Sequence, residues 1–152
     1  MKNNYVLYFA FGSNMLETRM LKRCPSALLI DSIAKLEDYQ LVFNRQGDYE
    51  DGGVASIEQK AGAVVYGLLY AMIVPDIENL DKIESPNDDA YNREVVTVST
   101  LSNQNVDCFT YIASPKGSFL PTKKYLDWII EGATIAGLPA SYIKKLRNIK
   151  SI

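Results

Sequence analysis

The residues best suited to chemistry lie in the stretch Tyr8, Phe9, Ala10, Phe11, Gly12, Ser13 and Asn14, and at the carboxylate of Glu84. The apolar run 5–11 predicts a buried strand, and Gly12 allows the backbone to bend sharply after it. Ser13 or Asn14 can then cap a helix that starts near Met15. Such a turn exposes backbone N–H groups that can hold a carboxylate or a phosphate. An ordinary strand–turn–helix corner is the alternative.

Glu84 has an unusual place on the helix that the pattern predicts over 75–84. At about 100° per residue, it falls in the apolar stripe of Ile77, Leu80 and Ile83 rather than on the polar face. It also ends the helix, where the macrodipole disfavours an anion. Both effects raise the pKa of a carboxyl group and suit a general base near neutral pH. The alternative is a frayed helix end that turns Glu84 out to solvent.

Several kinds of site are excluded because the sequence contains no histidine. Ser-His-Asp and Cys-His machinery and histidine-ligated metal sites all need that side chain. The two cysteines, Cys24 and Cys108, are too few for a structural zinc site, and we expect them to be reduced. A general base must therefore be Asp, Glu, Lys, Tyr or Cys. The phosphate-loop and dinucleotide-binding glycine motifs are also missing from the sequence.

Composition indicates one soluble globular domain over residues 1–152, with 47% hydrophobic and 22% charged residues. A net charge of −2 gives no electrostatic reason to expect nucleic acid or an anionic membrane as a partner. The chain has no apolar run of about 18 residues, so we expect no transmembrane helix. With so few cysteines and no cleavage pattern at the N-terminus, the expected location is cytoplasmic.

The elements that must position these residues follow from hydrophobic periodicity. After the first strand, strands are predicted over 27–36, 39–43, 54–57, 63–72, 91–100 and 106–113, with a surface loop over 46–53 and a turn over 86–89. Gly67 marks a bulge or a close backbone approach. Thr122 caps a long helix that Gly137 ends, and Pro139 begins a last helix that runs to Ile149. This order predicts an α+β fold whose six or seven strands can curl into a small barrel.

Residues 8–15, Tyr-Phe-Ala-Phe-Gly-Ser-Asn-Met, resemble the signature loop Tyr-Phe-Ala-Tyr-Gly-Ser-Asn-Leu of the gamma-glutamylcyclotransferase family. Further matches follow in order: Cys-Pro-Ser-Ala at 24–27, Gly-Gly-Val-Ala at 52–55, Val-Tyr-Gly-Leu-Leu-Tyr at 65–70, Leu-Asp-Lys-Ile-Glu at 80–84 and Gly-Leu-Pro at 137–139. Because several motifs recur over nearly the whole chain, the resemblance is specific. It implies a small mixed β-barrel with flanking helices.

The resemblance also implies an activity: the α-amino group of a γ-glutamyl amide attacks its own γ-carbonyl and releases 5-oxoproline with an amino acid or amine. Glu84 matches the family's catalytic glutamate, and Tyr125 resembles a substrate-binding tyrosine. Tyr91 could orient the carboxylate or bind substrate. The reaction needs no metal and no organic cofactor. The expected partner is a small γ-glutamyl substrate, and a homodimer is left open.

Phe11 departs from the family pattern, since a tyrosine usually stands there, and one hydroxyl contact is therefore missing. On the side of the leaving group, the sequence shows no basic clamp. We therefore expect tolerance for γ-glutamyl dipeptides or amines, and little activity on glutathione. The rival hypothesis is a non-catalytic module that binds a small ligand on the same fold, and a phosphate-binding protein is a weaker one.

Overall fold

The computed structural model describes residues 4–47, 52–84 and 91–152. The strands in these segments are β1 (Tyr5–Ala10), β2 (Leu28–Gln46), β3 (Gly53–Ile73), β4 (Tyr91–Ser99) and β5 (Asn105–Ala113). The helices are α1 (Glu17–Arg23), α2 (Val74–Glu84), α3 (Lys123–Ala136) and α4 (Ala140–Arg147), and a short 3-10 turn spans Ser13–Met15. No described helix is long and apolar enough to cross a membrane.

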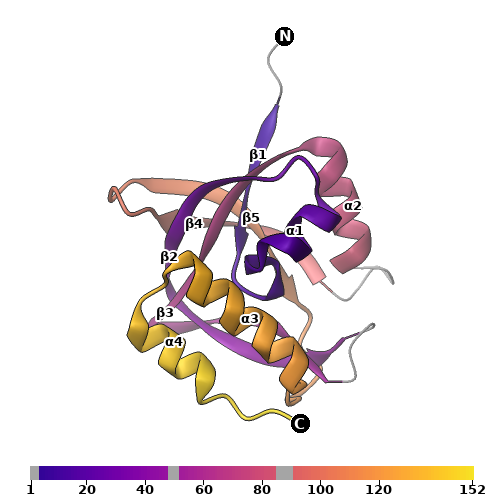
Figure 1. Cartoon of the computed structure of the whole chain (residues 1–152), viewed down its shortest axis with the longest axis vertical. Coiled ribbons are helices and arrows are strands. Elements are labelled where there is room, and N and C mark those ends of the chain that lie inside the picture. The colour runs from indigo at the N-terminus through magenta and orange to yellow at the C-terminus, as the bar shows by residue number, and fades with distance from the viewer. Residues whose placement is uncertain (1–3, 48–51, 85–90) are drawn as a thin grey trace.

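The strands close into a barrel in the order β1-β3-β2-β4-β5. β1 pairs antiparallel with β3 from Tyr5↔Ile73 to Ala10↔Leu68, and it closes the barrel by a parallel contact with β5 at Tyr8↔Phe109. Because the other pairings are antiparallel, the barrel is mixed. In Figure 1, α3 and α4 pack together across one side of it, while α1 and α2 lie side by side near the other end. The predicted α+β barrel with flanking helices is thus confirmed.

The two long strands differ from the prediction, which divided each of them in two. β2 and β3 pair almost continuously from Gln46↔Gly53 to Leu28↔Ala71, with register shifts on the way. Asp38 takes a φ of 64° and Gly62 a φ of 81°, and the Gly62 N–H donates to Asp38 Oδ1. The polar residues there are exposed, so the hydrophobic pattern stops. Backbone pairing needs no buried face, and the strands therefore continue past the residues at which the hydrophobic pattern stops.

Gly67 confirms the predicted close approach. A Cβ at this position would lie 2.3 Å from the Ala10 carbonyl oxygen and 2.8 Å from Phe9 Cε1. β1 and β3 can therefore pack closely only because residue 67 has no side chain. This contact fixes the end of β1, after which the chain enters the loop of interest.

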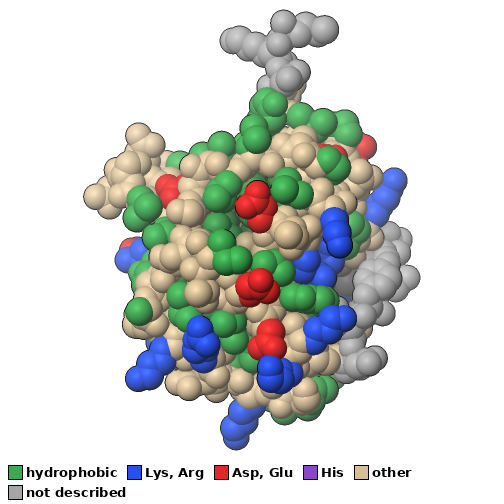
Figure 2. Space-filling view, viewed as in Figure 1, with side chains coloured by type: hydrophobic (Ala, Val, Ile, Leu, Met, Phe, Trp, Pro, Cys, Tyr) green, Lys and Arg blue, Asp and Glu red, His purple; other side chains and the backbone are tan. Residues whose placement is uncertain are grey.

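Both ends of α3 agree with the prediction, whereas α4 ends at Arg147, before the predicted end at Ile149. Thr122 Oγ1 accepts a hydrogen bond from the Tyr125 N–H at the start of α3. Gly137 ends α3 in the left-handed conformation, with a φ of 77°. The predicted loop 46–53 joins β2 to β3, although residues 48–51 and the whole turn 86–89 lie outside the described residues. On the face in Figure 2, basic and acidic side chains are interspersed, in keeping with the small net charge.

Candidate active site

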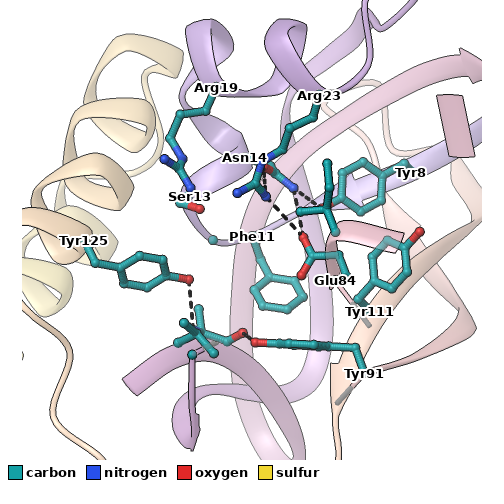
Figure 3. Close-up of a pocket in the computed structure, with 15 residues that line it drawn as sticks. Tyr8, Phe11, Ser13, Asn14, Arg19, Arg23, Glu84, Tyr91, Tyr111 and Tyr125 are labelled. Atoms are coloured by element: carbon teal, nitrogen blue, oxygen red, sulfur yellow. Dashed lines mark hydrogen bonds and ion pairs between the residues drawn. The ribbon is translucent and has the colours of Figure 1, made fainter. Parts of the chain in front are cut away.

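A cavity of about 250 Å³ opens beside the end of β1, between α1, the end of α2 and the start of α3 (Figure 3). This volume lies just below the range of about 300–1,000 Å³ that is usual for small-molecule sites. The lining combines aromatic, cationic and carboxylate side chains with small residues: Tyr8, Phe11, Gly12, Ser13, Asn14, Arg19, Arg23, Gly47, Val54, Ala55, Ile83, Glu84, Tyr91, Tyr111 and Tyr125. Most of the residues predicted for the site therefore meet at one place.

Phe9 and Ala10 are the exceptions among the predicted site residues. Successive side chains of a strand point to opposite faces, so Tyr8 lines the cavity and its neighbour Phe9 does not. Phe9 and Ala10 are both fully buried in the core. Their contribution is structural: the Phe9 carbonyl accepts a hydrogen bond from Thr110 Oγ1 in β5.

The loop after β1 takes a different form from the one predicted. Ser13 and Asn14 belong to the 3-10 turn, whose side-chain cap is missing, and α1 begins only at Glu17. The Asn14 side chain is turned toward Glu84 instead of back onto the helix end. The reason for the glycine also differs. Gly12 has a φ of −110°, which other residues adopt, but a Cβ there would lie 3.2 Å from Ala55 Cβ and 3.7 Å from the Tyr125 hydroxyl.

Glu84 projects into the cavity from the last turn of α2, with 18% of its side chain exposed. Its Oε1 lies 3.4 Å from Asn14 Nδ2 and 3.5 Å from Arg23 Nη1. Burial raises the pKa of Glu84, and Arg23, followed by Asn14, opposes part of that rise. This is the place and the direction of pKa change that the helix pattern predicts for a carboxylate inside an apolar stripe.

Asn14 is the centre of the hydrogen-bond network around this carboxylate. Its Nδ2 donates to the Tyr8 hydroxyl at 3.1 Å as well as to Glu84, and its Oδ1 accepts from Arg23 Nη1 at 3.2 Å. Burial, and next the negative charge of Glu84, raise the pKa of Tyr8 well above its ordinary value. Tyr8 is therefore neutral. Because its oxygen accepts the hydrogen bond from Asn14, its own O–H proton is left for donation to another group.

The opposite wall is built around the backbone of one residue of β3, Ala55. The ladder between β2 and β3 shifts register between Val42↔Ser56 and Arg45↔Val54, which leaves Ala55 at the irregularity. The Ala55 N–H donates to the Tyr125 hydroxyl at 3.0 Å, and its carbonyl accepts from the Tyr91 hydroxyl at 3.3 Å (Figure 3). Burial raises the pKa of Tyr125 to about 12 and that of Tyr91 further. Both tyrosines are neutral hydrogen-bonding groups.

The glycines before Ala55 allow the segment after β5 to cross over this wall. A Cβ on Gly53 would lie 2.3 Å from the Phe119 carbonyl oxygen, and one on Gly52 would lie 2.7 Å from that of Leu120. The Gly53 N–H donates to Leu120, and the Phe119 N–H donates to Phe43 in β2. The matching Gly-Gly-Val-Ala motif is therefore explained by close packing that holds Ala55 in place.

Sequence reasoning missed three polar residues of the cavity: Arg19, Arg23 and Tyr111. Arg19 and Arg23 are four residues apart, so they lie on the same face of α1. The Arg19 guanidinium stacks on Trp128 at 3.8 Å from the ring centroid, and the Tyr111 hydroxyl donates to Asp81. The sequence showed no basic clamp on the side of the leaving group, and the cavity has Arg19 and Arg23 in its lining. The four-residue spacing, directly after the loop, was the available signal.

The fold and the cavity define a class: a small mixed-barrel protein that places a buried carboxylate against a Gly-Ser-Asn turn in a small-molecule pocket. The model of the AIG2-like family matches residues 64–146. Curated gamma-glutamylcyclotransferases of Bos taurus and Homo sapiens are 38% and 35% identical over 148 residues, covering 95% of this chain and 78% of each relative.

A solved structure of a gamma-glutamyl cyclotransferase superposes with a TM-score of 0.92 at 33% identity, covering 98% of this chain and 90% of that one. The chain therefore belongs to the gamma-glutamylcyclotransferase family, which is a family of enzymes. The resemblance indicated by the sequence motifs is confirmed. Among the residues that the structure describes, no group of three or more Cys, Asp or Glu side chains is placed to hold a metal ion.

Proposed function

We propose that this protein is a gamma-glutamyl cyclotransferase that converts a small γ-glutamyl amide into 5-oxoproline and a free amino acid or amine. The observation that carries the proposal is the Glu84 carboxylate, buried in a small cavity and facing Asn14. The names of the similar proteins support the same reaction.

The substrate carries its own nucleophile, so the enzyme has to position it and to move protons. The α-amino nitrogen forms a bond to the γ-carbonyl carbon and closes a five-membered ring, and the original amide C–N bond then breaks. Because the attack is intramolecular, positioning supplies much of the acceleration. One proton must leave the α-ammonium group, and one must reach the departing nitrogen.

Glu84 is the proposed base that takes the proton from the α-ammonium group and passes one to the leaving nitrogen. The raised pKa of Glu84 brings its proton affinity closer to that of the groups with which it exchanges protons. Backbone N–H groups of the turn at Gly12, Ser13 and Asn14 are proposed to hold the glutamyl carboxylate or the developing oxyanion. Phe11, Tyr91 and Tyr125 shape the pocket around the glutamyl group.

The proposed substrates are γ-glutamyl dipeptides or γ-glutamyl amines rather than glutathione. A cavity of about 250 Å³ favours a small leaving group. Glutathione carries an additional glycine, so its leaving group is larger. Arg19 and Arg23 add positive charge to the lining and favour substrates with carboxylates.

The test is a comparison of kcat/KM for γ-glutamyl-alanine, a γ-glutamyl amine and glutathione, with 5-oxoproline as the measured product. We expect release from the first two and little from glutathione. A preference for glutathione would contradict the substrate class and leave the reaction intact. If the folded protein cyclises none of a broad γ-glutamyl panel, the non-catalytic binding module becomes the better hypothesis.

Two further expectations belong to this proposal. The unpaired, buried thiols of Cys24 and Cys108 support a reducing, cytoplasmic location. A homodimer is the second expectation. Light scattering of the purified protein would test it by giving the mass in solution.

A further inference from the structure

We propose that Arg23 is a positioning residue for the Glu84 carboxylate, acting on it both directly and through the side-chain amide of Asn14. The inference rests on the proposed function, in which Glu84 is the base, and it adds a residue that holds that base ready. It begins from a three-way contact among Arg23, Asn14 and Glu84, which Figure 3 marks with dashed lines.

One nitrogen of Arg23 serves two acceptors. Nη1 lies 3.2 Å from Asn14 Oδ1 and 3.5 Å from Glu84 Oε1. Only 22% of the Arg23 side chain and 18% of the Glu84 side chain are exposed. Because water is largely excluded, the attraction between the two charges is screened less than at the surface. This ion pair therefore differs from exposed pairs such as Lys123–Asp127, which contribute little.

The second action of Arg23 is to set the orientation of the Asn14 amide. A guanidinium can only donate hydrogen bonds, so it selects the oxygen end of the amide. The NH₂ end must then face Tyr8 and Glu84, as observed. If the amide were reversed, its oxygen would face the carboxylate, and two acceptors would repel each other. Arg23 thus makes Asn14 a donor to the base.

The other ionisable groups around Glu84 come from several elements. Arg19 and Cys24 face it from α1 and its C-cap, and four tyrosines face it from β1, β4, β5 and α3: Tyr8, Tyr91, Tyr111 and Tyr125. Burial raises the pKa of each of these tyrosines, and it raises the pKa of Cys24 to about 12. Below about pH 9 these hydroxyl and thiol groups are neutral, so a titration seen there belongs to the carboxylate.

Without Arg23, the rise in the pKa of Glu84 that burial causes would be opposed less. The carboxyl group would hold its proton to higher pH, and a protonated base cannot accept another. Arg19 also favours the ionised form, but it is the smaller influence of the two. The expected role of Arg23 is therefore to keep a buried carboxylate ionised and aimed at the cavity.

The experiment titrates Glu84 by NMR in protein labelled with ¹³C at the glutamate carboxyl, without substrate. Glu84→Gln assigns the signal. In Arg23→Met, which keeps the length of the side chain, we expect the pKa of Glu84 to rise by about one pH unit. Lys22→Met is the matched control, because Lys22 is the exposed neighbour of Arg23 on α1. In this variant Glu84 should titrate as it does in the wild type.

The kinetic arm measures kcat/KM against pH for the same variants. In Arg23→Met the acid limb should move to higher pH by the same amount as the NMR titration. A purely structural role would lower activity at every pH and leave the limb in place. Arg23→Lys keeps the charge but loses the planar guanidinium that contacts both Asn14 and Glu84. The pKa of Glu84 in this variant should therefore lie between its values in the wild type and in Arg23→Met.

The inference is overturned if Glu84 titrates in Arg23→Met as in the wild type, or if Lys22→Met moves the titration as far. If Arg23→Met does not fold, Arg23→Lys decides, and an unchanged pKa of Glu84 in that variant contradicts the proposal. The NMR arm needs no activity. A protein without cyclotransferase activity but with the expected titrations would therefore contradict the proposed function while leaving the Arg23–Asn14–Glu84 coupling established.

Discussion

The two walls of the cavity are built from different chemistry. The wall from the 3-10 turn, α1 and α2 carries Asn14, Arg23 and Glu84, joined by hydrogen bonds and an ion pair. The opposite wall carries tyrosine hydroxyls that are bonded to the backbone of Ala55, and burial keeps them neutral. The first wall carries a carboxylate whose pKa is raised by burial, whereas the second offers shape and fixed dipoles.

Under the proposed function, a chain without histidine assigns separate tasks to the two sides of one pocket. Proton transfer is favoured by a group whose pKa lies near the working pH, and burial moves the pKa of Glu84 upward in that direction. Substrate positioning needs rigidity, and on this wall the Ala55 backbone is held by hydrogen bonds with the Tyr125 and Tyr91 hydroxyls. The predictions below test this division by changing one wall at a time.

The largest expected effect is on the charged wall. Glu84→Gln should lower kcat by at least about 100-fold, because the neutral amide cannot act as a base, while the fold is kept. Glu78→Gln is the control, since Glu78 is exposed on the same helix. Steady-state kinetics with circular dichroism would check both variants. Normal turnover in a folded Glu84→Gln protein would show that Glu84 is not the base. The proposed difference in task between the two walls would then be wrong.

The next effect concerns the turn between the walls. Gly12→Val should raise KM by about tenfold or prevent folding, because its side chain would enter the space beside Ala55 Cβ and the Tyr125 hydroxyl. Gly12→Ala, which adds only the Cβ, should have a smaller effect. If folded Gly12→Val keeps the wild-type KM, the turn does not border the substrate.

A smaller effect is expected on the neutral wall. Tyr125→Phe should lower the free energy of unfolding by about 1–2 kcal/mol, because the buried Ala55 N–H loses its acceptor. Tyr91→Phe removes a longer hydrogen bond to the same residue and should cost less. Urea denaturation measures both changes. A larger loss for Tyr91→Phe would show that the two hydrogen bonds are ranked wrongly.

The smallest effect is a gain in stability. Burial raises the pKa of Glu84 in the folded protein, so this group stabilises the fold below its unfolded pKa, and the stabilisation is lost as pH rises through the folded pKa. Glutamine cannot ionise and avoids this loss. At pH 8, Tm of Glu84→Gln should exceed the wild-type value by about 2 °C, and the difference should close near pH 4. A lower Tm at pH 8 would mean that the ion pair with Arg23 outweighs burial.

Much of the fold could be predicted from sequence where periodicity and end signals agree. α2 was expected over 75–84 and spans Val74–Glu84, and β4 was expected over 91–100 and spans Tyr91–Ser99. The long strands β2 and β3 were divided because exposed polar residues interrupt the pattern, although backbone pairing continues. Closure of the barrel depends on contacts between distant strands, which local periodicity does not encode.

For the site, helix geometry singled out Glu84 and the strand–turn pattern singled out the loop with Asn14, and the family resemblance put both in one site. Their hydrogen bond across 70 residues of chain could not be predicted. Arg23 was missed because it belongs to no basic cluster in the sequence, and only its four-residue spacing from Arg19 on α1 indicates a shared face. Phe9 was included because the whole motif was taken as the site, whereas strand alternation sends its side chain into the core.

The position of β1 in the barrel also governs when the protein can fold. Tyr8 is made early, yet its ladder partners are Tyr70 in β3 and Phe109 in β5. Pairings between such distant parts of the chain close large loops and slow folding. During synthesis, β1 must wait until β5 has left the ribosome before the barrel can close. A nascent chain that ends after Glu84 already carries the acid, the amide and the arginine, but it lacks β4 and β5, which supply Tyr91 and Tyr111 to the same cavity.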